Sequence, residues 1–233
     1  QDLSALLPPA LFVLNDTRVM RARLRGRKPT GGRAELLLIE RESGEAGSVE
    51  RWRALGKANK RLAAGARITI GNGVVEARII ERRDGGELLV ELETEAGVAM
   101  ALERCGELPL PPYIRRAPRD IDLERYQTVF ARRVGAVAAP TAGLHLSKSL
   151  LGDLEAAGHQ VTHVTLHVGP GTFAPVTAER IEDHVMHAER YAIPERAAEA
   201  IGGGGFKSWS VDFIFAAPGQ SAAAWEASLP GVL

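Results

Sequence analysis

Cysteine, long hydrophobic runs and an excess of charge of either sign are all missing from this sequence. Its 233 residues include one cysteine, Cys105, which excludes a framework of internal disulfides and fits a reducing compartment, so we expect a cytoplasmic protein. No apolar run approaches the roughly 18 residues that a membrane-spanning helix needs. The apolar stretch up to Leu14 is interrupted by Pro8 and Pro9 and follows no basic leader, so we expect no signal peptide.

The overall charge is balanced, because 29 Lys and Arg residues face 29 Asp and Glu residues. This balance argues against indiscriminate binding to nucleic acid through bulk charge. Locally the charge is uneven: residues 18–33 hold seven basic residues and residues 51–67 hold six, with no acidic residue in either stretch. Two such stretches fit the footprint of a polyanion, although a solvated protein face produces the same pattern.

The first half of the chain has the periodicity of short strands. Between Arg18 and Arg25 apolar residues alternate with basic ones, which predicts one half-buried strand with Met20, Ala22 and Leu24 inward and Val19, Arg21, Arg23 and Arg25 outward. The turn signals Asn72-Gly73 and Asp84-Gly85 separate further strands. Short antiparallel strands in this number close into a barrel or stack as a sandwich. The full set of predicted strands is 10–14, 18–25, 34–40, 51–55, 67–70, 74–80 and 87–92.

The second half alternates between helical and strand patterns, which is α/β in character. Asp122 is placed to cap a helix that carries Tyr126, Val129, Phe130 and Arg133 on one face. Further helices are predicted over 97–104, 147–157, 177–183 and from Pro194 to a stop at Gly202. Strands are predicted over 161–168, with His163, Thr165 and His167 on one face, and over 187–193. Residues 202–205 predict a flexible break, after which only 211–215 resembles a strand.

Four places concentrate polar chemistry. Asn15-Asp16-Thr17-Arg18 offers an amide, a carboxylate, a hydroxyl and a guanidinium at a strand end, or else forms an Asx turn. Tyr113 to Arg116 and Arg125 to Thr128 set tyrosine beside arginine, which suits a stacked base with its phosphate but is also typical of core. Residues 135–145 consist mostly of small residues ahead of His145, as in a ligand-binding floor or a tightly packed crossing. His167 to Phe173 leads an imidazole into a glycine turn.

Metal binding is the weaker interpretation of the histidines. His163, His167, His184 and His187 could each supply a nitrogen ligand, but the sequence has neither a helical His-Glu-x-x-His motif nor paired cysteines. We therefore expect no metal site. A dinucleotide fold is also disfavoured, because the glycines at 169 and 171 lack a third partner at the required spacing.

Several long strings, taken in their order, resemble one family, the S-adenosylmethionine:tRNA ribosyltransferase-isomerases of the queuosine pathway. The resemblance covers about residues 8–201. The strings that carry it are Leu14–Val19, Pro109–Ile114, Arg125–Val129, Gly135–His145, Thr165–Phe173 and the His184-x-Met186-His187-x-Glu189 pattern. It implies an α+β, multi-domain fold in which an antiparallel β-barrel (20–95) is joined to an α/β domain (1–19 and 96–201). The remaining residues, 202–233, form an atypical segment in this division.

The resemblance also implies a reaction in which S-adenosylmethionine donates its ribosyl group to 7-aminomethyl-7-deazaguanine at the wobble position of tRNA. The product is epoxyqueuosine, with adenine and methionine released, and we expect a monomer without a metal cofactor. Catalytic residues would be His145, His167, His187, Glu189 and Asp16. Substrate-binding residues would be Asn15, Thr17, Arg18, Tyr113, Arg115, Tyr126, Gln127, Pro140, Thr141, Gly143, Gly169, Gly171 and Thr172. The tRNA backbone would be held by Arg21, Arg23, Arg25, Lys57, Lys60 and Arg61.

This sequence also departs from the family pattern. After Ile201 the Gly-Thr-Thr-Ser-Val-Arg and Asn-Phe-His-Leu-Pro segments are missing, and Leu146 replaces an aromatic residue. Because the chain also starts at Gln1, we expect it to be part of a longer gene product or a shortened member of the family. The alternatives are a non-catalytic RNA-binding barrel derived from this family and a histidine-ligated metal hydrolase.

Overall fold

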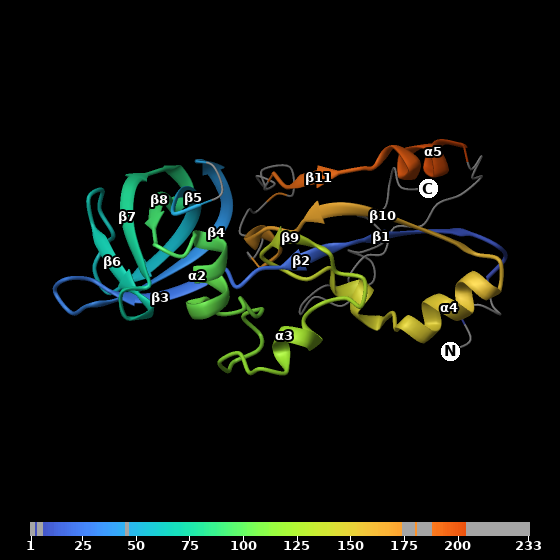
Figure 1. Ribbon diagram of the computed structural model, residues 1–233, viewed down its shortest axis with the longest axis horizontal. Coiled ribbons are helices and arrows are strands. Elements are labelled where there is room, and N and C mark those ends of the chain that lie inside the picture. Colours follow the sequence, from blue (N-terminus) through green and yellow to red (C-terminus); the bar gives the residue numbers. More distant parts are fainter. Residues whose placement is uncertain (1–2, 4–6, 45–46, 174–179, 181–187, 204–233) are drawn as a thin grey trace.

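The computed structural model describes residues 3, 7–44, 47–173, 180 and 188–203. A barrel forms one end of an elongated molecule, and a sheet with flanking helices forms the other (Figure 1). The helix predicted over 177–183, the strand-like run 211–215 and the predicted site residue His187 lie outside the described residues. No helix among those described is both long and apolar enough to cross a membrane.

The first half closes into a barrel rather than a sandwich. Six strands follow one another around it in the order β3-β4-β5-β8-β7-β6, and all neighbouring pairs are antiparallel, including β3 with β6. The strands are β3 (Arg23–Arg27), β4 (Arg33–Ser43), β5 (Val49–Ala58), β6 (Arg67–Ile70), β7 (Val75–Arg82) and β8 (Glu87–Glu93). Two of the connections are the short turns η1 (Gly71–Gly73) and η2 (Asp84–Gly86). The strands predicted over 34–40, 51–55, 67–70, 74–80 and 87–92 and both turn signals are confirmed.

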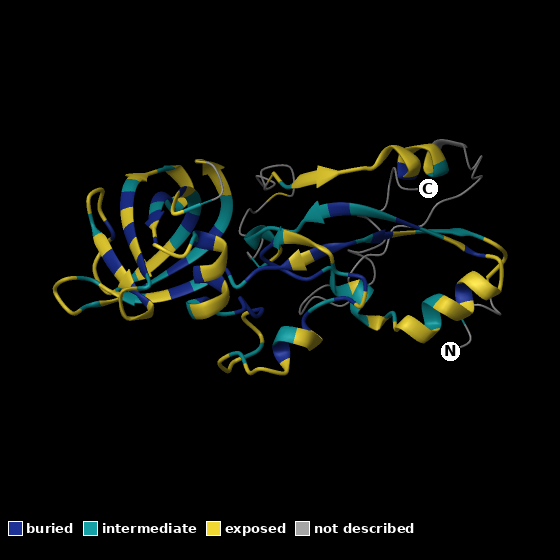
Figure 2. Ribbon diagram, in the orientation of Figure 1, coloured by how far each residue is buried: buried dark blue, intermediate teal, exposed yellow. Residues whose placement is uncertain are grey.

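Period-two alternation explains why this barrel is stable. Leu36 and Leu38 of β4 point inward with Ile68 and Ile70 of β6, and all four are fully buried. Figure 2 shows this alternation as buried bands along the barrel strands, separated by exposed ones. The helix α2 (Val98–Cys105) packs its buried face onto the same core.

The strand predicted over 18–25 is wrong as a single element. It is divided into β2 (Thr17–Val19), which pairs in parallel with β9 (Arg133–Ala136), and β3, which belongs to the barrel. Between them Met20 donates a backbone hydrogen bond to Ala136, and Ala22 accepts one from Leu38 of the barrel. Val19, predicted to face outward, is only 4% exposed, because on β2 it packs in a separate small core. The alternation of buried and exposed residues breaks here, because the neighbours Val19 and Met20 are both buried where the partner strand changes.

The other end of the molecule is built on a mixed sheet. The strand β1 (Leu11–Asn15) pairs in parallel with β10 (Gln160–His167), which pairs antiparallel with β11 (Arg190–Ala192). The predicted helix over 147–157 is confirmed as α4 (Lys148–Ala156), where the Ser147 hydroxyl caps the N-terminus by accepting from the Leu150 amide. The helix predicted after Pro194 is confirmed as α5 (Glu195–Gly203). The fold class is therefore α+β as expected, while the domain limits 20–95, 1–19 and 96–201 stay a prediction.

The helix predicted to start at Asp122 is also wrong in its extent. It has one turn, α3 (Asp122–Arg125), and Asp122 is its first helical residue rather than its cap. The Asp122 carboxylate instead accepts hydrogen bonds from the Arg116 guanidinium and the Arg119 amide. The helix ends early because the next polar side chain, Gln127, uses both amide atoms on the Val19 backbone, at 2.9 Å each.

Candidate active site

A cleft opens beside the C-terminal half of β10, against the start of β2 and β9. Its volume is about 540 Å³. The face of β10 predicted to carry His163, Thr165 and His167 lines it, which confirms that these three residues share a face. The other lining residues are Asp16, Arg132, Arg133, Ala192, Pro194 and Arg196. Ligands of open sheets with parallel strands bind near the carboxyl ends of those strands, so the position is a normal one for a site.

Among the described residues that line this cleft, Asp16 is the one carboxylate, and it is held from two sides. Its Oδ1 accepts a hydrogen bond of 2.6 Å from the Thr165 hydroxyl, and its amide donates to the Val164 carbonyl at 2.9 Å. Its own carbonyl accepts from the amides of Arg132 and Arg133 at 2.7 and 3.1 Å. With 7% exposure, Asp16 presents a nearly buried negative charge to the cleft.

The side-chain amide of Asn15, at the end of β1, forms hydrogen bonds with the backbone of β10 beyond the last residue pair of the two strands. Its Oδ1 accepts from the Leu166 amide at 2.9 Å and from the Thr17 amide at 3.1 Å, and its Nδ2 donates to the Leu166 carbonyl at 2.9 Å. The bond from the Thr17 amide, two residues further on, is that of the Asx turn considered as an alternative for this string, so that alternative describes part of the role of Asn15. Asn15 fixes the backbone on both sides of Asp16.

His167 is the most constrained imidazole of the cleft. Its Nδ1 lies 2.8 Å from the Thr17 hydroxyl, which is fully buried and lies 3.3 Å from the Arg133 carbonyl. When the hydroxyl donates to that carbonyl, Nδ1 must carry the proton of His167, which leaves Nε2 with a free lone pair. Behind the ring lies Gly135, where a Cβ atom would stand 2.6 Å from Cε1 of His167. Only glycine leaves room for this ring position.

The surroundings keep both imidazoles in their neutral form. Burial lowers the pKa of His167, the nearby Arg190 lowers it further, and Asp16 and Glu40 partly oppose this. Burial also lowers the pKa of His163, with Arg132 and Arg196 acting in the same direction and Asp16 against it. A neutral imidazole can accept a proton, as a general base must.

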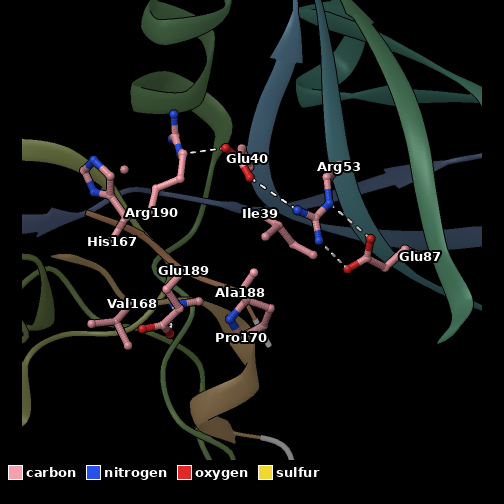
Figure 3. A pocket seen from close by; sticks show the side chains of 12 residues that line it. Ile39, Glu40, Arg53, Glu87, His167, Val168, Pro170, Ala188, Glu189 and Arg190 are labelled. Atoms are coloured by element: carbon pink, nitrogen blue, oxygen red, sulfur yellow. Dashed lines mark hydrogen bonds and ion pairs between the residues drawn. The ribbon is translucent and has the colours of Figure 1, made fainter. Parts of the chain in front are cut away.

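A smaller hollow lies on the other side of His167, between the barrel and β10 (Figure 3). Its volume of about 30 Å³ is that of a water-sized group. Arg53 of the barrel pairs with Glu87 and Glu40, and Glu40 also pairs with Arg190 at 2.6 Å. This chain of charges connects the barrel to β11 next to His167.

Glu189 belongs to the same hollow. Its Oε1 accepts a hydrogen bond of 2.8 Å from the Gly169 amide. The structure thus brings Glu189 together with Gly169, in the glycine turn that follows His167. Further along, in η4 (Pro170–Phe173), Gly171 is half-buried and Thr172 is exposed.

The small-residue string 135–145 forms a tightly packed crossing over its first part. Residues 136–139 are buried, and the amides of Val137 and Ala138 donate to the Val168 carbonyl. A Cβ at Gly143 would lie 2.9 Å from Thr128 and 3.0 Å from Phe130. The string ends in the turn η3 (Thr141–His145). His145 is exposed there and lines neither hollow, and Pro140 and Thr141 are half-buried, so the structure does not bring His145 together with His167.

The residues of the tyrosine and arginine strings fall into a buried group and an exposed group. Tyr126 is buried, and burial raises its pKa to about 12. Gln127 is occupied with the Val19 backbone. Tyr113 is 75% exposed, and Arg18 and Arg115 are exposed as well.

The basic residues expected to contact the tRNA backbone fall into a set paired with glutamates and an unpaired set. Arg21, Arg23 and Arg25 each form an ion pair with a neighbouring glutamate, at 3.2 to 3.5 Å. Lys57, Lys60 and Arg61 are exposed, and none of them pairs with an acid in the part of the chain that the structure covers. The second set is therefore the one with charge available for a partner.

Seven of the nine residues named above for the large cleft were not predicted as site residues, and four of these seven are basic. His163 was considered only as a metal ligand, although its alternation with His167 was a sufficient signal. Arg132, Arg133 and Arg196 had no signal in the sequence, because they converge only through the pairing of β2 with β9 and the packing of α5 on β10. Within the described ranges, no three His, Cys, Asp or Glu side chains gather in a way that could hold a metal ion.

Comparison with known proteins identifies relatives over most of the chain. A family model described as "queuosine biosynthesis protein" matches residues 1–204. The S-adenosylmethionine:tRNA ribosyltransferase-isomerase of Anaeromyxobacter sp. (strain Fw109-5) is 51% identical over 202 residues, which cover 86% of this chain and 57% of that protein. The protein of the same name from Citrifermentans bemidjiense is 50% identical over 195 residues, with 84% and 56% covered.

A solved structure, that of S-adenosylmethionine tRNA ribosyltransferase from Thermotoga maritima, matches 87% of this chain and 50% of its own with 21% identity and a TM-score of 0.30. The chain thus spans a little over half the length of the curated relatives that it matches.

Proposed function

The chain belongs to the queuosine biosynthesis protein family, and on this premise we propose that it acts as an S-adenosylmethionine:tRNA ribosyltransferase-isomerase. The ribosyl group of S-adenosylmethionine would be transferred to 7-aminomethyl-7-deazaguanine at the wobble position of tRNA, giving epoxyqueuosine, adenine and methionine. The observation that carries this proposal is the gathering of His163, His167 and Asp16 in one cleft of about 540 Å³, a size that suits a nucleoside-sized ligand.

The first chemical step needs a base at the ribose. The sulfonium of S-adenosylmethionine acidifies the C5′ protons, so a neutral imidazole placed there can remove one of them. His167 fits this role because its pKa is lowered and because the Thr17 hydroxyl at Nδ1 leaves Nε2 free to take the proton. The C5′ proton would move to Nε2, and the resulting imidazolium would be stabilised by the nearby carboxylates of Asp16 and Glu40.

Two further groups have roles in this scheme. The Asp16 carboxylate offsets the positive charge of the sulfonium or of the substrate amine, which favours binding next to His167. Adenine leaves more easily when it is protonated or hydrogen-bonded, and the neutral His163, on the same face of β10, can donate its ring N–H to the departing base as a hydrogen bond. Glu189 and His187 stay predicted members of the site, as does His145.

The tRNA partner must present its modified base outside the stacked anticodon loop, because enzymes that act on a base need it exposed. The exposed Tyr113 and Arg115 suit contacts with such a base and its phosphate. Lys57, Lys60 and Arg61 on the barrel suit contacts with the tRNA backbone. A tRNA partner also implies that the protein works in the cytoplasm.

The test is direct detection of the products. The protein is incubated with S-adenosylmethionine and with tRNA that carries 7-aminomethyl-7-deazaguanine, and the nucleosides and small molecules are analysed by mass spectrometry. The proposal predicts the ribosylated nucleoside together with one adenine for each modified base. Unmodified guanine tRNA and omission of S-adenosylmethionine serve as controls. Adenine release without a modified nucleoside, or the lack of both, would overturn the proposal.

A further inference from the structure

Three arginines line the large cleft, and no residue that the structure describes compensates their charge. Arg133 begins β9, Arg132 directly precedes it, and Arg196 comes from the first turn of α5. All three are exposed, and none forms an ion pair or a side-chain hydrogen bond with any residue that the structure describes. On the barrel, by contrast, arginines such as Arg53 and Arg83 are paired with glutamates.

The position of these arginines is built into the fold. The amides of Arg132 and Arg133 donate to the Asp16 carbonyl, and the Arg133 carbonyl lies 3.3 Å from the Thr17 hydroxyl that holds His167. Arg196 is fixed from the opposite side, because its neighbour Ala197 is fully buried where α5 packs on β10. Three arginines from two separate elements thus line one cavity.

The local charge of the cleft is positive. Asp16 is the one acidic residue among the described residues of its lining, and its Oδ1 already accepts from Thr165. Arginine forks match the geometry of carboxylate and phosphate groups, and such charge-assisted hydrogen bonds are the strong ones in proteins. We propose that Arg132, Arg133 and Arg196 form a binding site for a single anionic group, a carboxylate or a phosphate, placed in the cleft beside His167.

The identity of the natural ligand rests on the proposed function, whereas the anion site itself does not. Under that function the anion is either the carboxylate of the methionyl part of S-adenosylmethionine or a phosphate of the anticodon loop. In both cases the arginines bind the negative end of a substrate while Asp16 faces its positive part. A substrate held at both ends is oriented toward His167.

The site can be tested without substrate, with inorganic phosphate as the probe. The C2–H signals of His163 and His167 are followed by NMR during a phosphate titration at constant ionic strength. We expect saturable shifts in the wild type and an affinity at least tenfold weaker in Arg196→Gln and in the Arg132→Gln/Arg133→Gln double variant. Arg196→Lys, which keeps the charge, should recover part of the affinity. Arg82→Gln, an exposed arginine of β7 on the barrel, is the matched control and should bind as the wild type does.

Thermal unfolding of each variant checks that the fold is intact. If the wild type shows no saturable shift, or if the arginine variants bind phosphate as tightly as Arg82→Gln, the proposal is overturned. Because these arginines are exposed and form no ion pair or side-chain hydrogen bond with the described residues, each variant should unfold at the temperature of the wild type.

A second set of measurements identifies the source of the anion. Dissociation constants are measured for S-adenosylmethionine, for its decarboxylated analogue and for an anticodon stem-loop. A carboxylate site predicts that Arg196→Gln weakens S-adenosylmethionine at least tenfold and leaves the analogue unchanged. A phosphate site predicts that only the stem-loop is weakened. If the wild type binds phosphate but neither substrate, the proposed function fails and the anion site stands. If both substrates bind equally well to the wild type and the variants, the anion site fails and the proposed function stands.

Discussion

Gly135 is the residue where a single added carbon atom should disturb the proposed active site most. In Gly135→Ala the new Cβ would lie 2.6, 2.7 and 3.0 Å from Cε1, Nδ1 and Nε2 of His167. Carbon atoms in contact prefer a separation of about 3.5 to 4.0 Å, so the ring must move by roughly 1 Å. The hydrogen bond between Nδ1 and the Thr17 hydroxyl, now 2.8 Å long, would then be broken.

The expected cost follows from these contacts. Overpacking of this kind destabilises a protein by about 1 to 3 kcal/mol, and a lost hydrogen bond contributes about 1 kcal/mol. We therefore expect Gly135→Ala to lower the free energy of unfolding by about 2 to 4 kcal/mol. Under the proposed function, a shift of about 1 Å in a catalytic group should lower turnover about 100-fold.

The assay combines denaturant unfolding with the NMR signals of His167. Gly152→Ala is the matched control, because Gly152 lies in α4 with open space where a Cβ would stand. Alanine is the better helix former, so this control should raise stability by up to about 1 kcal/mol. The reasoning is refuted if Gly135→Ala unfolds within about 0.5 kcal/mol of the wild type and leaves the His167 signals in place.

Three further predictions concern the same part of the molecule. Asn15→Asp removes the donor to the Leu166 carbonyl and sets a carboxylate against it, so denaturant unfolding should show a loss of about 1 to 3 kcal/mol; an unchanged midpoint would contradict the clamp described for Asn15. Thr17→Val removes the partner of His167 Nδ1, so ¹⁵N NMR should show a changed tautomer ratio that Thr17→Ser does not show, and equal ratios in all three proteins would refute the pairing. Because the pKa values of His163 and His167 are lowered in the folded state, the unfolded chain binds protons more readily. The free energy of unfolding should then have its full value above a pH of about 6.5, the ordinary histidine pKa. It should decrease as the pH falls from there through the lower pKa values that the two histidines have in the folded state. The His163→Gln/His167→Gln double variant should show a shallower decrease in pH-dependent denaturation, and an identical pH profile would contradict this assignment.

Local patterns were sufficient wherever one strand or helix kept one set of partners. The alternation over residues 161–168 correctly placed His163, Thr165 and His167 on a single face, and Asn72-Gly73 marked a real turn in which Asn72 has a φ of 56°. Both features depend on side-chain period or backbone preference, which neighbouring residues determine.

Patterns were insufficient where distant segments decide the outcome. The strand predicted over 18–25 is broken because its two halves pair with β9 and β4, and alternation carries no information about the partner. The helix predicted after Asp122 ends early at the contact between Gln127 and Val19, which are 108 residues apart.

The same limit applies to the site. His145 follows a run of small residues and His167 precedes a glycine turn. Nothing in the local sequence distinguishes the exposed imidazole of His145 from the imidazole of His167 in the cleft. Arg132, Arg133 and Arg196 meet only after β9 and α5 have packed on their neighbours. The barrel was therefore predictable in most of its strands, whereas the convergence of charges on the cleft was not.

Product formation by His167→Gln tests the central claim most directly. The variant is compared with the wild type and with His145→Gln in single-turnover reactions with S-adenosylmethionine and tRNA that carries the aminomethyl base. A general base contributes about 10² to 10⁴ in rate, so His167→Gln should slow formation of the ribosylated nucleoside by about that factor. The loss should exceed that in His145→Gln by at least about tenfold. A His167→Gln variant that keeps the wild-type rate, or one that is less impaired than His145→Gln, would contradict the account.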